Sequence, residues 1–422
     1  MKVKEIIGEG IPVDGEVEPG FEGVRDAFLE NFRSRGEVGA SVCVTVGGET
    51  KVDLWGGVAD PQTGWPWGRD TVSVVFSCTK GATALCAHIL ASRGKLDLDA
   101  PVAEVWPEFA QKGKGAVTAR MMLDHSAGVP ALRDPVKRNG IYDWTYMVDR
   151  LAAEEPFWEP GTRNGYHGMT FGWTVGELVR RVSGKSLGAF FRDEVARPLG
   201  LDFWIGLPEE IEPRVAPVQL YVSPPEEIAT PFLRALAGDP KSIPALFFRN
   251  TGVAPLEWFN TREGHAAEIG AGNGVTNARG LAGLYAPLAN GGGLGGVRLV
   301  DAATLARMAE VSMATHFDAT LYIPTRFALG FMKSMDNRKR SVAPKLRDEA
   351  CDSVILGASA FGHVGAGGSI GLADPGCGLA FGYSMNRGGP GLLLNGRGQS
   401  LVDAAYRALG YGSKDAGVWT RG

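Results

Sequence analysis

The 422-residue sequence predicts an α+β fold, with antiparallel strands near both ends of the chain and a mainly helical middle. Three observations lead to this prediction. A helical pattern and two alternating strand patterns lie near the N-terminus, a helical stretch cut by Gly and Pro turn signals spans about 77–210, and strand patterns return after residue 360. Sheet-forming segments therefore lie on either side of the helical middle, and we find no internal repeat.

The N-terminal part should contain a helix, an antiparallel strand pair and a short strand that leads into a second helix. These elements are expected at 20–35, 40–46 with 51–57, 71–76 and 81–93. In the first helix, Val24, Phe28 and Phe32 lie on one side, as in an amphipathic helix. Gly47-Gly48-Glu49 supplies the turn between the paired strands.

In the middle, the clearest helices are expected at 171–182 and 187–196, where Gly184 and Pro198 end them. Residues 205–262 are rich in proline and aperiodic, so they predict no regular element. The remaining elements are a helix, three strands and a final helix, expected at 278–290, 361–365, 368–373, 378–385 and 400–408.

Composition indicates an ordinary globular protein. Hydrophobic residues make up 44% and charged residues 21%, and a net charge of −4 gives no reason to expect nucleic acid or an anionic membrane as a partner. The first nine residues lack the apolar core of a secretory signal, and no stretch of about 18 apolar residues predicts a membrane span. Five cysteines without a C-x-x-C pair indicate thiols in a reducing compartment, so we expect a cytoplasmic protein.

The strongest chemical signal is Ser77-Cys78-Thr79-Lys80, at the start of a predicted helix. Residues three apart lie on one helix face, with β-carbons about 5–6 Å apart. The positive end of the helix dipole favours an alkoxide at Ser77, while the same field and burial lower the pKa of Lys80. A neutral lysine can take the serine proton, which makes a nucleophile without histidine. The second match, Ser92 to Lys95, lies at a helix end with its lysine beyond the helix-breaking Gly94, and it is interpreted as structural.

Two other motif matches are excluded by the residues and predicted elements around them. Residues 367–371 match the G-x-S-x-G nucleophile elbow, but that fold needs a histidine after the serine, and the last histidine is His363. Residues 291–296 match G-x-G-x-x-G, but they follow a helix and precede a strand, the reverse of a dinucleotide site. The six histidines show no metal-ligand spacing. We therefore expect no metal and no cofactor.

Two further segments can complete a Ser–Lys site. Tyr166 lies in a glycine-rich loop just before a helix, which suits a third group for proton transfer to the leaving group. Residues 363–368 form a glycine-rich strand edge where backbone can approach a ligand closely. Each segment alone is weak evidence, because a loop tyrosine or a glycine-rich strand is usually structural.

Together the three segments resemble the serine β-lactamase-like superfamily, which contains class C β-lactamases, DD-peptidases and family VIII carboxylesterases. Ser77-x-x-Lys80 matches the S-x-x-K motif. Tyr166-His167-Gly168 is similar to the Tyr-x-Asn element, and His363-Val364-Gly365 is similar to K-T-G. Supporting similarity lies in segments 122–130, 170–173 and 197–200.

The resemblance spans about 20–410 and implies one β-lactamase/transpeptidase-like hydrolase domain of two lobes. An α/β lobe, about 1–76 and 265–422, would hold the antiparallel sheet, flanked by the N- and C-terminal helices. A mainly helical lobe would comprise about 77–264, and the Ser77 helix would lie between the lobes.

The resemblance also implies roles. Ser77 would be the acyl nucleophile, and Lys80 and Tyr166 would share general-base and general-acid work, with the assignment between them left open. The backbone N–H groups of Ser77 and Ala366 would form the oxyanion hole. Losing one such donor typically raises the barrier by roughly 3–4 kcal/mol.

Departures from the family pattern bear on the substrate. His363 and Gly365 occupy the substrate-binding strand, where a lysine at position 363 would bind a carboxylate, and histidine with a pKa near 6.5 is mostly neutral at pH 7. Gly168 replaces an asparagine that contacts an acylamide group. Both changes weaken recognition of anionic amides. The aromatic residues within 232–259 either wall an acyl pocket or belong to the core.

The pattern therefore predicts a carboxylesterase that hydrolyses short-chain acyl esters, with a small-molecule ester as its partner. A β-lactamase or D-amino-acid peptidase, an acyltransferase of the same fold, and a non-catalytic binding module are the alternatives. The sequence indicates neither the natural ester nor the oligomeric state.

Overall fold

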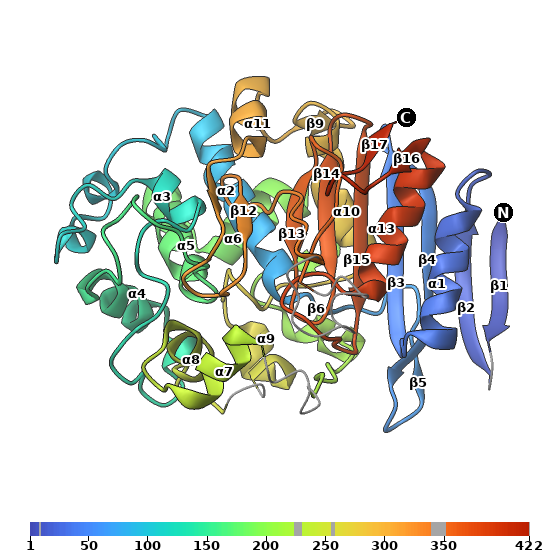
Figure 1. Ribbon diagram of the computed structural model, residues 1–422, viewed down its shortest axis with the longest axis horizontal. Coiled ribbons are helices and arrows are strands. Elements are labelled where there is room, and N and C mark those ends of the chain that lie inside the picture. The colour runs from blue at the N-terminus through green and yellow to red at the C-terminus, as the bar shows by residue number, and fades with distance from the viewer. Residues whose placement is uncertain (8–9, 223–229, 255–257, 339–351, 422) are drawn as a thin grey trace.

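The computed structural model describes residues 1–7, 10–222, 230–254, 258–338 and 352–421. Figure 1 shows an antiparallel sheet with helices on both faces, next to a mainly helical region, which confirms the α+β prediction. Across the sheet the strands are β1 (Lys2–Ile7), β2 (Ile11–Val17), β4 (Glu49–Asp60), β3 (Gly39–Val46), β15 (Leu379–Met385), β14 (Ile370–Asp374) and β13 (Phe361–Val364), with β5 (Trp65–Pro66) paired to β4.

The two ends of the chain meet in this sheet, because β3 pairs antiparallel with β15. Nearly every residue of these two strands is buried, so the sheet is covered on both faces. Helices α1 (Glu22–Ser34) and α13 (Gly396–Ala408) pack together on one face, and α10 (Ala278–Ala289) packs on the other (Figure 1).

The sequence pattern missed the N-terminal hairpin β1–β2, which extends the sheet beyond β4. Pro12 and Gly15 interrupt the pattern of β2, although Val13 and Val17 are buried. Gly15 has φ +135°, and a Cβ there would lie 2.1 Å from the Asp53 carbonyl oxygen. The pairing of β2 with β4 therefore requires glycine at this position.

In the helical region, α2 (Thr79–Ser92) runs beside the sheet and packs against α5 (Thr170–Ser183) (Figure 1). The predicted strand 71–76 is shorter than expected. β6 (Ser73–Val74) pairs with β8 (Val275–Thr276), and Val72 forms a single bridge with Val215. The chain then turns into the short helix η1 (Phe76–Cys78).

The proline-rich stretch 205–262 contains helices that the sequence analysis did not predict, α7 (Pro231–Gly238) and α8 (Ile243–Arg249). Their prolines lie in the first turn, where a missing N–H removes no helical hydrogen bond. Thr230 and Ser242 cap the two helices through the N–H groups of Leu233 and Ala245. The prolines of α7 and α8 therefore lie at helix starts and do not prevent a regular element in this stretch.

The other helices and strands are short. The predicted helix 187–196 is α6 (Leu187–Phe191), continued by a π-helical turn, η5 (Arg192–Ala196). The rest are η2 (Val102–Glu104), η3 (Pro107–Ala110), α3 (Ala119–Leu123), η4 (Gly140–Tyr142), α4 (Trp144–Ala153), β7 (Phe203–Trp204), η6 (Glu209–Arg214), η7 (Trp258–Asn260), α9 (Arg262–Ala266), β9 (Gly293–Leu294), β10 (Val297–Arg298), α11 (Ala302–Ala309), β11 (Met313–Thr315), β12 (Thr325–Phe327), β16 (Tyr411–Ser413) and β17 (Thr420–Arg421).

Two large hydrophobic clusters form the core. One contains the inner side of α2 with the helical region, and the other contains most of the sheet with α1 and α13. Cys78 belongs to the first cluster, whereas Tyr166 and Val364 belong to the second. The segments that carry the candidate site therefore meet where the two clusters adjoin. Within the described ranges, every helix is too short or too polar to cross a bilayer.

Candidate active site

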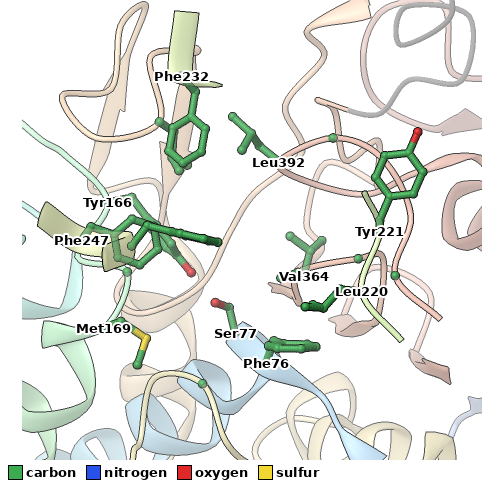
Figure 2. Close-up of a pocket in the computed structure, with 18 of the residues that line it drawn as sticks. Phe76, Ser77, Tyr166, Met169, Leu220, Tyr221, Phe232, Phe247, Val364 and Leu392 are labelled. Atoms are coloured by element: carbon green, nitrogen blue, oxygen red, sulfur yellow. The ribbon is translucent and has the colours of Figure 1, made fainter. Parts of the chain in front are cut away.

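Ser77 lies in η1, immediately before α2, and its side chain extends into a cavity (Figure 2). The preceding residue, Phe76, has φ +45°, a left-handed conformation that costs a non-glycine residue about 1–3 kcal/mol. Hydrogen bonds hold this turn in place: Thr79 Oγ1 donates to the Phe76 carbonyl at 2.5 Å and accepts from the Gly274 N–H at 2.8 Å. The backbone thus presents the Ser77 hydroxyl to the cavity.

Lys80 is fully buried one helical turn from Ser77. Its Nζ lies 3.0 Å from Ser77 Oγ, 2.7 Å from the Gly168 carbonyl oxygen and 2.8 Å from the Ala271 carbonyl oxygen. Burial lowers the pKa of Lys80 well below its usual value. Among the residues that the structure describes, no carboxylate forms an ion pair with Lys80. The amine is therefore held close to the serine and is favoured in its neutral form.

Tyr166 joins Ser77 and Lys80 as the third member of the candidate catalytic cluster. Figure 2 shows its hydroxyl pointing toward Ser77, and Lys80 Nζ lies 4.7 Å from the centre of its ring. Burial raises the pKa of Tyr166 far above its usual value, although a hydrogen bond with the Ser77 side chain opposes this shift. The ring packs against three others, those of His125, Phe327 and His363, at 5.0, 6.0 and 6.0 Å between ring centres. The phenol is thus fixed in position and protonated at neutral pH.

Asp318 holds the Tyr166 loop, and the sequence analysis did not identify it. This buried carboxylate lies between β11 and β12 and accepts the Tyr166 N–H at 3.0 and 3.1 Å. It also accepts the N–H groups of Thr320 and Leu321, both at 2.8 Å, and the Thr325 hydroxyl at 3.1 Å. Burial raises the pKa of Asp318, while these hydrogen bonds oppose the shift. Nothing in its local sequence distinguishes Asp318, because the partner that links it to the site, Tyr166, comes from a distant segment.

Buried histidines support the same loop. The His167 N–H donates to His125 Nδ1 at 3.1 Å, and His167 Nε2 accepts the Val129 N–H at 3.0 Å. Burial lowers the pKa of His167 to about 4 and that of His363 to about 3, so both are neutral at pH 7. The histidines therefore orient the loop without adding positive charge beside Lys80.

His363 and Gly365, the two predicted substrate-binding residues, do not belong to the lining of the cavity. Val364 and Ala366 line the cavity, whereas the side chain of His363 is buried beside Tyr166. A Cβ on Gly365 would lie 2.2 Å from Ser369 Oγ and 2.3 Å from the Val75 carbonyl oxygen. Glycine at position 365 thus lets β13 approach the segment that carries Ser77. Ala366 and Ser77, the two predicted oxyanion-hole residues, border the same cavity.

The cavity has a volume of about 310 Å³ and a mainly apolar lining. Representative lining residues are Phe76, Met169, Phe232, Phe247, Trp258 and Val364, several of which surround Ser77 in Figure 2. Aromatic residues of the stretch 232–259 thus contribute to the wall. Within the described part of the chain, no group of three or more His, Cys, Asp or Glu side chains is placed to hold a metal ion.

The chain is similar to known proteins over most of its length. The family model Beta-lactamase matches residues 24–405. The chain is 37% identical to the esterase/beta-lactamase LipL of Mycobacterium tuberculosis over 392 residues, which cover 90% of this chain and 84% of that protein. A crystal structure of a family VIII carboxylesterase is similar with a TM-score of 0.81 and 37% identity, covering 94% of this chain and 99% of that one.

A penicillin-binding protein homologue from Caulobacter crescentus has a TM-score of 0.82 and 34% identity, and again 94% of this chain and 99% of that one are covered. These matches extend over both the sheet and the helical region. The chain therefore belongs to the Beta-lactamase family of serine hydrolases.

Proposed function

We propose that the protein is a carboxylesterase that hydrolyses short-chain acyl esters through an acyl-Ser77 intermediate. The observation that carries this proposal is the contact of a buried lysine amine with the Ser77 hydroxyl at the edge of an apolar cavity. The names of two relatives, an esterase/beta-lactamase and a family VIII carboxylesterase, support ester substrates. A β-lactam or D-amino-acid peptide bond would use the same acylation chemistry, and an acyltransferase would differ only in the acceptor.

The three partners of Lys80 suggest which residue acts as the base. A neutral amine has two N–H groups and one lone pair, and the carbonyl oxygens of Gly168 and Ala271 can only accept. If the two N–H groups bind these carbonyls, the lone pair faces the Ser77 hydroxyl. Lys80 would then accept the serine proton, whereas Tyr166, with its raised pKa, remains protonated and donates.

The proposed reaction has two balanced half-reactions. As Ser77 Oγ attacks the ester carbonyl carbon, its proton moves to Lys80, and the N–H groups of Ser77 and Ala366 stabilise the oxyanion. Tyr166 protonates the departing alcohol oxygen and regains a proton from the Lys80 ammonium. A water molecule then attacks the acyl carbon and gives a proton to Lys80. Lys80 passes this proton to Ser77 Oγ as the bond between Oγ and the acyl carbon breaks, which releases the carboxylic acid and restores the serine hydroxyl.

Replacing the nucleophile tests this proposal. Ser77→Ala should abolish hydrolysis of p-nitrophenyl butyrate, a loss of about 10⁴-fold or more, since the covalent route is removed. In the wild-type protein, a fluorophosphonate probe should add one label, located at Ser77 by peptide mass spectrometry. A folded Ser77→Ala protein that retains the wild-type rate would refute the acyl-Ser77 mechanism. Nitrocefin turnover that equals ester turnover would instead favour the β-lactamase alternative.

A further inference from the structure

We propose that the pocket selects esters with an uncharged, apolar acyl group, and that the ring of Phe247, packed on Gly168, determines this selectivity. The inference rests on the proposed esterase function and specifies its substrate class. The acyl group is the part of the substrate that remains attached to Ser77 in both half-reactions. Side chains that line the cavity next to Ser77 therefore contact the acyl group in both half-reactions.

Phe247 occupies the space that a side chain at position 168 would fill. A Cβ on Gly168 would lie 2.1 Å from Cε2 and 2.5 Å from Cζ of the Phe247 ring. Both residues border the cavity, and the Gly168 carbonyl accepts a hydrogen bond from Lys80. The ring is thus linked to the Ser–Lys pair through a single residue. A polar side chain at position 168 could reach the acyl group only if this ring moved away.

The apolar wall continues on both sides of Phe247, because the α7–α8 pair supplies several of its neighbours. Phe232, Leu233 and Leu236 from α7 line the cavity, as does Phe248, whose ring centre lies 6.1 Å from that of Phe247. These side chains offer no hydrogen bond to a substrate. An acyl group gains affinity here by leaving water for an apolar surface.

The charges around the cavity disfavour an anionic acyl group. The described lining includes no lysine or arginine side chain, and it does include the carboxylate of Asp352, which accepts the Leu392 N–H at 3.0 Å. Arg397 lies beyond the wall formed by Gly389 and is ion-paired with Glu37 at 2.8 Å. A carboxylate on the acyl group would therefore lose its hydration without meeting an unneutralised cation among the described residues.

The first test varies the acyl chain. Wild-type protein should hydrolyse p-nitrophenyl butyrate at least tenfold better than the acetate, as judged by kcat/KM, because the added methylenes contact the apolar wall. Phe247→Ala should raise the octanoate-to-butyrate ratio about tenfold, since the chain gains the space of the ring. Phe317→Ala, which removes an exposed phenylalanine outside the cavity, should leave the ratio unchanged. A ratio within twofold of wild type in folded Phe247→Ala would overturn the role of Phe247.

A double-mutant cycle tests the contact itself. Gly168→Ala should lower kcat/KM for butyrate about tenfold, because the new methyl group forces the ring to move. The same substitution in a Phe247→Ala background should cost less than threefold, since no ring remains to clash. Additive effects would show that the two residues do not act on each other. Phe247→Leu supplies a folded variant of intermediate size if the alanine variant is unstable.

The second test varies charge at constant length. The p-nitrophenyl monoester of succinate has the same four-carbon acyl chain as butyrate but ends in a carboxylate. Butyrate should be preferred by about tenfold or more, and Asp352→Asn should narrow this preference. Equal turnover of the two esters would overturn the inference while leaving the esterase proposal intact. Activity that is absent on every ester, or independent of Ser77, would instead refute the proposed function itself.

Discussion

The catalytic cluster and the pocket wall are held in place by different forces. Around Ser77, each polar group is fixed by buried hydrogen bonds, from Lys80 to two carbonyls and from the Tyr166 N–H to Asp318. The α7–α8 wall is held mainly by half-buried apolar side chains around two capped helices. Directional hydrogen bonds fix atoms to within fractions of an ångström, whereas apolar contacts accept substitutions of similar volume. Substitutions in the cluster should therefore affect the chemistry, and substitutions in the wall should affect which ester is used.

The largest expected effect follows from removing the amine. Lys80→Met should lower kcat about 10³-fold or more, because the Ser77 proton loses its acceptor. Lys114→Met is a matched control, since Lys114 is also fully buried and donates to the backbone carbonyls of Gln111 and Glu154, away from the cavity. Steady-state kinetics with p-nitrophenyl butyrate should show the loss only in the Lys80 variant. A similar loss in both folded variants would mean that the effect is structural.

A smaller effect is expected for the residue that positions Tyr166. Asp318→Asn places an amide NH₂ where a carboxylate oxygen now accepts N–H groups, which should lower kcat about 10²-fold with little change in KM. The free energy of unfolding should fall by about 1.5–3 kcal/mol, the usual contribution of a hydrogen bond to a charged group.

Asp374→Asn provides the comparison, because Asp374 is a buried carboxylate on β14 that accepts from Tyr406 and Ser359 and does not line the cavity. It should lose comparable stability in urea unfolding but retain kcat. If kcat falls equally in both variants, Asp318 has no special role in positioning Tyr166.

The smallest effect is expected in the wall. Leu236→Ala shortens a half-buried side chain on α7 that lines the cavity. It should change kcat/KM for p-nitrophenyl butyrate by less than about fivefold, mainly through KM, because only apolar contact area is lost. A loss in kcat as large as that of Asp318→Asn would show that the wall also orders the catalytic cluster, and the distinction between the two regions would fail.

The site could be predicted from sequence where it depends on local spacing. Ser77 and Lys80 lie one helical turn apart, so a single predicted helix brings them together. Tyr166 was indicated by its glycine-rich loop and by its order along the chain. Asp318 was not predicted as a site residue, because its role depends on a contact with a segment far away in the sequence. Phe247 was named only among the aromatic residues of 232–259 that either wall a pocket or belong to the core, since its contact with Gly168 is also made across a long stretch of chain.

The contrast between local sequence patterns and contacts with distant segments also explains which helices and strands were predicted correctly. The long amphipathic or alternating patterns of α1, β3, β15 and α13 were predicted within a few residues of their observed bounds. Some of the missed elements contain proline or glycine at positions where the tertiary structure tolerates them, as in the first turn of α8 and at Gly15 of β2. Others, such as β1 and α11, are short segments that contain neither residue. The segment 71–76 has the β-branched composition of a strand, but only Val72, Ser73 and Val74 have a β partner.

The most direct test of this account is the pH dependence of kcat/KM for p-nitrophenyl butyrate in the wild-type protein. Burial without a carboxylate partner lowers the pKa of Lys80, so the neutral, reactive amine should form as pH rises through a value well below the roughly 10.4 of a free lysine. We predict that kcat/KM increases tenfold per pH unit below that value and then reaches a plateau. A profile that stays flat from pH 5 to 9 would contradict the assignment of Lys80 as the base.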